Sequence, residues 1–268
     1  MKTKFIILGC GNSMGNPRID GYWGESNKKN SKNERSRCSA LIKKGKNLIL
    51  IDTSPDIRNQ LLTYKIKSIS SVIYTHEHSD QTNGIFELRP FAVVSGDKKN
   101  TYFYGKKTKK INVYGNFKTI TLLKKRFDYC FKKRGIYPPI VKGNIVKKSF
   151  YLGKNSEKIK FDSFQVKHGK VNVTGYIFNK TAYLSDCNDL AIVNNKRLRN
   201  LNYIIIDCLK KHTTYAHFGL NDCLYINKML KPKKMILTNL SQEMDYNTLV
   251  KKMPKNVIPA YDGLTINL

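Results

Sequence analysis

The chain has 268 residues, 40% of them hydrophobic and 11% aromatic, which is enough to bury a large core. Its formal net charge is +30, from 49 Lys and Arg against 19 Asp and Glu, so the protein attracts anions such as phosphates and nucleic acids. The absence of any apolar run of about 18 residues excludes a transmembrane helix. The apolar run at residues 5–8 is too short for a signal-peptide core, so we expect a cytoplasmic protein with no membrane partner.

The positive charge and the cysteines have simple explanations. Lys, Asn and Ile are plentiful along the whole chain, which is typical of AT-rich genomes. We therefore rank compositional drift above a dedicated nucleic-acid surface as the source of the charge. The 6 Cys are scattered without a Cys-x-x-Cys pair, which predicts buried reduced thiols rather than a disulfide framework or a zinc ribbon.

Short apolar runs between turn signals predict strands, and two segments have helical spacing. The predicted strands are residues 4–8, 48–51, 71–74, 111–114, 176–178, 203–206 and 235–237. The predicted helices are residues 55–64 and 221–230, the second with Asn221 as its N-cap. Strands and helices mixed along one chain favour an α/β sandwich. We expect a single domain over residues 1–268, with basic surface excursions near 96–110 and 124–148.

The segment at residues 75–81, Thr-His-Glu-His-Ser-Asp-Gln, directly follows one of these apolar runs. Side chains alternate along a strand, so His76 and His78 emerge on the same side. Two convergent imidazoles with the nearby carboxylate of Asp80 suit a divalent transition metal. The chain has only 5 His, so two within one tripeptide indicate a metal site.

Other polar side chains stand at the ends of apolar segments. Asp52 and Asn239 follow two of the predicted strands, Asp186 follows the strand-like residues 182–184, His168 follows residues 164–167, and His217 lies just before the second predicted helix. Each one alone is explained equally well as a turn cap or an exposed loop residue. Together they predict a site at the edge of a sheet, where α/β folds place their functional residues.

The chain resembles a known family, the metallo-β-lactamase fold, in short sequence motifs that are spread over nearly its whole length. The motifs lie at residues 8–13, 50–56, 75–81, 84–85, 87–90, 168–169, 183–186, 237–239 and 260–263. Within that family they are similar to the PhnP-like branch, the phosphoribosyl cyclic phosphate phosphodiesterases. The resemblance implies an αβ/βα sandwich with one or two metals bound in loops at the strand ends.

The resemblance also implies a ligand set for two metals. His76, His78 and His168 would bind the first metal, Asp186 would bridge, and Asp80 would bind the second. Gln81 and Asn239 replace two histidines that the family uses for the second metal. Amide oxygens are weak, hard ligands that suit Mn²⁺ or Mg²⁺ better than Zn²⁺. We therefore expect one tightly bound Zn²⁺ or Mn²⁺, with the second metal weak or absent.

The resemblance also raises the question of a structural zinc, because PhnP itself has one that is held by cysteines of an early loop and a late histidine. Here the corresponding loop, residues 22–30, contains no cysteine, and Gln242 stands at the late position. We therefore expect no structural zinc.

Further roles follow from the same resemblance. Asp80 would orient the attacking water and His217 would be the general acid, with His212 in reserve. Asp52 would support a ligand rather than bind metal. Arg37 and Arg89 could hold phosphate oxygens bidentately, and ordinary ion pairs are an equally good explanation of both.

Three functions remain open. We rank first a metal-dependent phosphodiesterase that cleaves a small cyclic or ribose-linked phosphate diester, an anionic substrate that fits the charge. The second is an RNA-processing nuclease of the same fold, although the sequence reveals no clear aromatic-plus-basic platform for RNA. The third is a degenerate, non-catalytic member that binds a nucleotide or a partner. Relatives of this fold often dimerise, so a homodimer also remains open.

Overall fold

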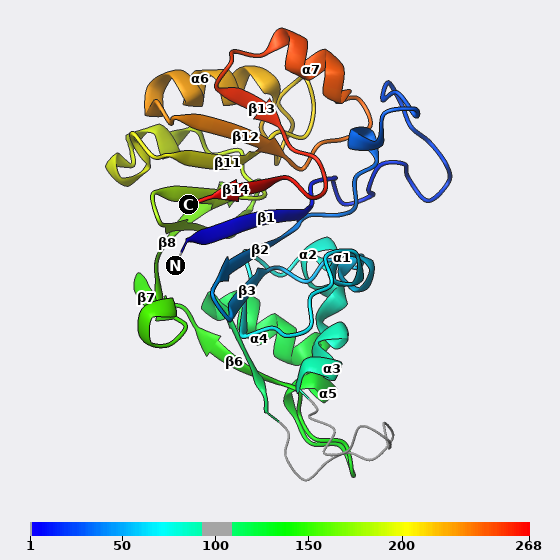
Figure 1. Ribbon diagram of the computed structural model, residues 1–268, viewed down its shortest axis with the longest axis vertical. Coiled ribbons are helices and arrows are strands. Elements are labelled where there is room, and N and C mark those ends of the chain that lie inside the picture. Colours follow the sequence, from blue (N-terminus) through cyan, green and yellow to red (C-terminus); the bar gives the residue numbers. More distant parts are fainter. Residues whose placement is uncertain (1, 93–108) are drawn as a thin grey trace.

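The computed structural model describes residues 2–92 and 109–268 (Figure 1). The strands are β1 (Thr3–Gly9), β2 (Ser39–Lys44), β3 (Asn47–Ile51), β4 (Ser71–Ile73), β5 (Ile111–Gly115), β6 (Val141–Ile145), β7 (Ser149–Leu152), β8 (Ile159–His168), β9 (Val171–Phe178), β10 (Thr181–Leu184), β11 (Tyr203–Asp207), β12 (Lys234–Thr238), β13 (Val257–Pro259) and β14 (Thr265–Asn267). The α-helices are α1 (Ile57–Thr63), α2 (Ser79–Thr82), α3 (Arg89–Ala92), α4 (Phe117–Arg126), α5 (Asp128–Phe131), α6 (Leu220–Leu230) and α7 (Tyr246–Lys252). The 3₁₀ helices are η1 (Ser31–Asn33), η2 (Asn83–Leu88), η3 (Asn155–Glu157), η4 (Leu190–Asn194) and η5 (Lys196–Leu198). No helix in these two ranges is both long and apolar enough to cross a membrane.

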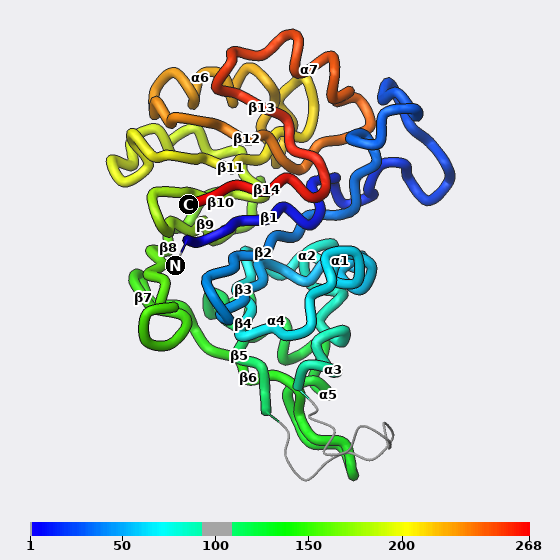
Figure 2. The backbone as a smooth tube through the Cα atoms, viewed as in Figure 1, coloured from blue at the N-terminus to red at the C-terminus, as the bar shows by residue number. Residues whose placement is uncertain are grey.

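The strands form two seven-stranded sheets that pack face to face. The first has the order β14-β1-β2-β3-β4-β5-β6 and the second β13-β12-β11-β10-β9-β8-β7. Figure 2 shows that the N-terminal half builds most of the first sheet and the C-terminal half the second, until β14 returns to pair with β1. Helices α1 and α4 cover the outer face of the first sheet, and α6 and α7 that of the second (Figure 1). The architecture is the expected αβ/βα sandwich.

Three hydrophobic clusters fill the spaces between these layers, and the apolar strands contribute to two clusters at once. In β11, Ile204 and Ile206 point toward α6, whereas Ile205 points between the sheets. In β3, Leu50 faces α1, whereas Ile49 and Ile51 face the second sheet. Strands that are buried on both faces have continuous apolar runs instead of alternation, which is why these strands could be predicted from sequence.

The parallel strands bring their carboxyl ends to one edge of the sandwich. Strand β3 pairs in parallel with β4, and β10 with β11 and β11 with β12. Two contacts join the sheets at this edge: Thr174 N donates to Thr75 O at 2.9 Å, and Ser185 Oγ donates to Thr75 Oγ1 at 3.3 Å. The residues that follow these strands therefore converge on one place.

Some local predictions need correction. Asn221 lies inside α6, which begins one residue earlier, and Gly219 is the N-cap. The Asp222 carboxylate accepts the Gly219 N–H at 2.8 Å, so an acidic side chain within the first turn does the capping. The stretch 124–148, predicted as a basic surface excursion, supplies the end of α4, all of α5 and strand β6. Residues 96–108 of the other predicted excursion lie outside the described ranges.

The early loop is fastened to the rest of the chain by hydrogen bonds. The backbone oxygen of Gln242 accepts the Glu25 and Ser26 N–H groups at 3.0 and 3.1 Å, and its side-chain amide donates to Gly15 O. The fully buried Arg35 donates to Ser241 O, Asn33 Oδ1 and Met244 O at 3.2, 2.8 and 2.6 Å. Together these contacts hold the early loop against the segment around Gln242.

Candidate metal centre

Three imidazoles meet at the converging strand ends. His76 follows β4, His78 is the N-cap of α2, and His168 ends β8. The ring centroids lie 4.5 Å apart for His76 and His78, 5.6 Å for His76 and His168, and 5.2 Å for His78 and His168. One ring nitrogen from each lies within 4.8 Å of the others, close enough to share one ion. These are the three residues predicted to bind the first metal.

Asp52 holds His76 in place through a neighbour. Its carboxylate accepts the Thr75 N–H and hydroxyl, each at 2.8 Å, and the Thr75 hydroxyl lies 2.9 Å from His76 Nδ1. Asp52 has a φ of 59°, the left-handed region that Asp tolerates better than most residues. A hydrogen bond to one ring nitrogen orients a ligating histidine and fixes which nitrogen faces the ion. Asp52 is therefore linked to the His76 ring through Thr75.

The chemistry of the imidazoles fits a metal. Within the described residues, His76 Nε2 is buried and has no hydrogen-bond partner, which is costly unless an ion occupies that position. Burial lowers the pKa of His76 well below its usual value. Burial also lowers the pKa of His168, whose Nδ1 lies 2.7 Å from Ala216 O. Both rings are thereby kept neutral, the form that binds metals.

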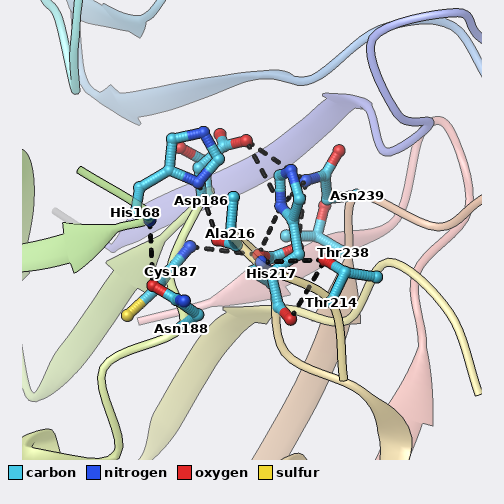
Figure 3. A network of polar contacts seen from close by, with 12 residues as sticks. His168, Asp186, Cys187, Asn188, Thr214, Ala216, His217, Thr238 and Asn239 are labelled. Carbon is cyan, nitrogen blue, oxygen red and sulfur yellow. Dashed lines mark hydrogen bonds and ion pairs between the residues drawn. The ribbon is translucent and has the colours of Figure 1, made fainter. Parts of the chain in front are cut away.

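At the second predicted metal position, the side chains expected to bind the ion form hydrogen bonds with one another. Gln81 Nε2 donates to Asp186 Oδ2 at 3.2 Å, and Asn239 Nδ2 donates to Asp186 Oδ1 at 3.3 Å. Both oxygens of the predicted bridging carboxylate are therefore engaged by amide N–H groups. Figure 3 shows Asp186 beside Asn239 and His217. Gln81 and Asn239 thus face Asp186 with their nitrogens rather than with the oxygens expected to bind metal.

His217 joins this cluster through Asp207, a residue that the sequence analysis missed. His217 Nδ1 lies 2.8 Å from Asp207 Oδ2, and the other Asp207 oxygen accepts the Asn239 amide at 2.9 Å. Burial opposes protonation of His217, but its hydrogen bond to Asp207 and that carboxylate's charge raise its pKa to about 9. Atoms of His168, Asp186 and His217 also lie within 4.8 Å of one another, as a second group able to hold an ion. Asp207 ends β11 after three isoleucines, which is the same signal that revealed Asp52.

Asp80 lies in α2 beside the cluster, where its charge adds to that of Asp207. Burial and these two carboxylates raise the pKa of Asp186, and the Asp80 charge also raises that of His217. His212, the reserve general acid, is exposed. Asp80 therefore remains beside the predicted second metal position, and His217 is the histidine that the fold brings into the cluster.

The two predicted phosphate-binding arginines already have partners. Arg37 forms a bidentate ion pair with Asp56, with Nε–Oδ2 and Nη2–Oδ1 distances of 2.7 and 2.5 Å. The Arg89 guanidinium lies 5.5 Å from the ring centroid of Phe86 and 5.6 Å from that of Tyr137. Neither contact lies within the imidazole cluster, although Asp80 is close enough to raise the pKa of Arg37 together with Asp56.

A cavity of ≈ 600 Å³ lies between the early loop and α1. Its lining includes Arg37 and Asp56 but none of the clustered imidazoles. The charged residues that line it are Glu34, Arg35, Arg37, Asp56 and Asp262. Three carboxylates against two guanidinium groups make this space better suited to a neutral or cationic group than to a phosphate.

Comparisons with known proteins agree with this geometry. A family model described as a beta-lactamase superfamily domain matches residues 47–238. The crystal structure of a diphosphatase from the PhnP family is 28% identical, with a TM-score of 0.84, and the match covers 100% of this chain and 98% of that one. Zinc-bound PqqB from Methylobacterium extorquens shares the fold, with 15% identity, a TM-score of 0.72 and coverage of 99% and 100%.

One curated relative is much longer than this chain. It is a Porphyromonas gingivalis protein named octanoyltransferase, 26% identical over 267 residues. The match covers 97% of this chain and 51% of the relative, so the chain spans about half of that protein's length. The family match runs from β3 to the end of β12 and includes all three clustered imidazoles. The chain therefore belongs to the beta-lactamase superfamily and has the metallo-β-lactamase fold, with the resemblance to the PhnP branch that its sequence indicated.

Proposed function

We propose that this chain is a metal-dependent phosphodiesterase that hydrolyses a small phosphate ester with a single tightly bound ion, Zn²⁺ or Mn²⁺. The observation that carries the proposal is the triad of His76, His78 and His168, with a buried ring nitrogen that no described residue satisfies. When bound there, a divalent ion would activate water and neutralise phosphate charge. The similar PhnP-family diphosphatase also supports cleavage of a phosphorus–oxygen bond.

The surrounding residues have separate tasks in this proposal. Asp80 accepts a proton from the attacking water and aligns it. The Nδ1 atom of His217 is hydrogen-bonded to Asp207, which leaves Nε2 as the ring nitrogen that can give a proton to the leaving group. The non-reacting part of the substrate would fit the cavity beside Arg37, whose volume lies within the range of small-molecule sites. The cyclic or ribose-linked phosphate named above remains our choice of substrate.

The P. gingivalis relative does not change this choice. Its name refers to octanoyl transfer by a protein of which the chain spans about half. The observations at the site concern imidazoles and carboxylates suited to metal-assisted hydrolysis. We therefore place phosphate ester hydrolysis above acyl transfer for this chain.

Hydrolysis of small phosphate esters tests the function directly. We expect the metal-loaded protein to hydrolyse at least one member of a panel made of a ribose cyclic phosphate, a linear phosphodiester and a diphosphate diester. Inorganic phosphate or phosphomonoester release would be measured with Zn²⁺, with Mn²⁺ and after chelation. Turnover that chelation abolishes supports the proposal. Metal-loaded protein that cleaves none of the three would favour the non-catalytic binding protein.

The number of bound metals tests the role of the two amides. Because Gln81 and Asn239 donate to both oxygens of Asp186, we expect one retained metal per chain after dialysis. The double variant Gln81→His with Asn239→His restores two imidazoles and should retain two. Elemental mass spectrometry gives the count, and the electron paramagnetic resonance spectrum of Mn²⁺ shows whether two ions are coupled. Two metals in the unchanged protein would contradict the single-ion site.

A further inference from the structure

An exposed group of aromatic side chains lies on the first sheet's side of the molecule. Phe86 of η2 and Tyr129 of α5 have ring centroids 5.6 Å apart, and Arg89 spans from Phe86 to Tyr137. Phe86, Tyr129 and Tyr137 are 41%, 46% and 51% exposed, which is unusual for large rings that pack together. We call Phe86, Arg89, Tyr129 and Tyr137 the aromatic platform. The platform is assembled from three separate segments, which is why the sequence did not reveal it.

Positive charge is dense in the chain segment that carries two rings of the aromatic platform. The segment from the last turn of α4 to β6, residues 124–145, contains Tyr129 and Tyr137 and has seven exposed cations: Lys124, Lys125, Arg126, Lys132, Lys133, Arg134 and Lys142. Its one acidic residue is Asp128, which forms an ion pair with Arg134. The local excess of cations is therefore large even for this basic chain, and it lies beside exposed rings.

The aromatic platform is also close to the metal centre. Helix η2 begins directly after α2, so Phe86 lies six positions after Asp80, a reach of about 20 Å at most. The Arg126 guanidinium donates to Glu77 O, between His76 and His78, and Lys118 Nζ lies 2.7 Å from Glu77 Oε1. A single extended ligand can therefore contact both places.

We propose that the aromatic platform binds single-stranded nucleic acid, with bases stacked on Phe86 and Tyr129 and phosphates held by the surrounding lysines and arginines. Stacking on aromatic rings within a basic surface is how proteins bind single strands without reading their sequence. Seven cations spread over several elements match a strand with many phosphates better than a mononucleotide. This proposal concerns binding only, so a measured affinity can support or contradict it whether or not the protein hydrolyses phosphate esters.

The test measures the dissociation constant of a labelled oligouridylate of about a dozen nucleotides, a length typical of such sites. Fluorescence anisotropy would be recorded with a chelator present, so that binding is separated from cleavage. Tyr129→Ala should raise the dissociation constant by roughly five- to a hundredfold, the loss expected for one stacked base. Tyr225→Ala is the matched control, because Tyr225 is also 46% exposed but lies on α6 of the other sheet. Binding should also weaken steeply with salt.

Two further measurements keep the test decisive. Tyr129→Phe retains the ring and should bind like the unchanged protein, whereas Lys132→Glu with Lys133→Glu should weaken binding without touching a ring. Equal affinity of the Tyr129→Ala and Tyr225→Ala variants would overturn the proposal. Displacement of the strand by uridine monophosphate at a comparable concentration would also overturn it, since the platform would then be a site for small nucleotides.

Discussion

Replacing His168 with alanine should abolish tight metal binding and almost all hydrolysis. His168 belongs to both groups of potential ligands, so its loss leaves neither group complete. Removing residues that merely support metal ligands already weakens affinity by about 10- to 100-fold, and removing a ligand should exceed that. Loss of the ion's contribution, several kcal/mol of transition-state stabilisation, would lower kcat/KM on the order of a thousandfold or more.

Metal content and kcat/KM measured on the same samples check this prediction. His212→Ala is the control for removing an imidazole, because His212 is exposed, and that variant should keep its metal. Circular dichroism would show that the His168→Ala protein is folded. A folded His168→Ala protein that still retained one metal per chain would exclude His168 as a ligand and move the site toward His217 and Asp186.

The imidazole triad could be predicted because its signal is local. His76 and His78 are two residues apart at the end of an apolar run, and strand geometry alone brings their side chains together. His168 was marked by its place after a strand. The family resemblance then joined these segments, and the fold places all three rings together as expected.

The orientation of the amides could not be predicted in the same way. The residue types of Gln81 and Asn239 show that two imidazoles are replaced, but an amide offers both an oxygen and two N–H groups. Which end faces Asp186 depends on where the carboxylates of Asp186 and Asp207 lie. Because those positions are set by the pairing of β10, β11 and β12, they emerge only in the folded structure.

The aromatic platform shows a second limit of sequence reasoning. Phe86, Tyr129 and Tyr137 have no common spacing, and each alone resembles an ordinary surface or core ring. The packing of α5 beside η2 brings them together. Part of the basic charge that we ascribed to composition lies in the segment that contains Tyr129 and Tyr137. This observation favours the nucleic-acid hypothesis more than the sequence alone did.

Replacing Arg35 with alanine should lower the free energy of unfolding by about 3–5 kcal/mol. Arg35 is 1% exposed and donates to two backbone oxygens and one amide oxygen. The variant leaves the acceptors on Ser241, Met244 and Asn33 without this donor inside the protein. Buried acceptors without partners are costly, so the early loop should detach from the segment around Gln242. Urea denaturation of the two proteins measures the difference.

The matched control for this prediction is Arg18→Ala, which removes a partly exposed ion pair with Asp20 from the same loop. Exposed pairs contribute about 0–1 kcal/mol, so this variant should remain close to the unchanged protein. Because hydrogen bonds hold the loop, the decrease in the free energy of unfolding caused by Arg35→Ala should be equal with and without a chelator. If the difference in unfolding free energy disappears once both proteins are chelated, a metal fastens this loop. Equal stability of the two arginine variants would instead show that the buried guanidinium contributes little to holding the loop.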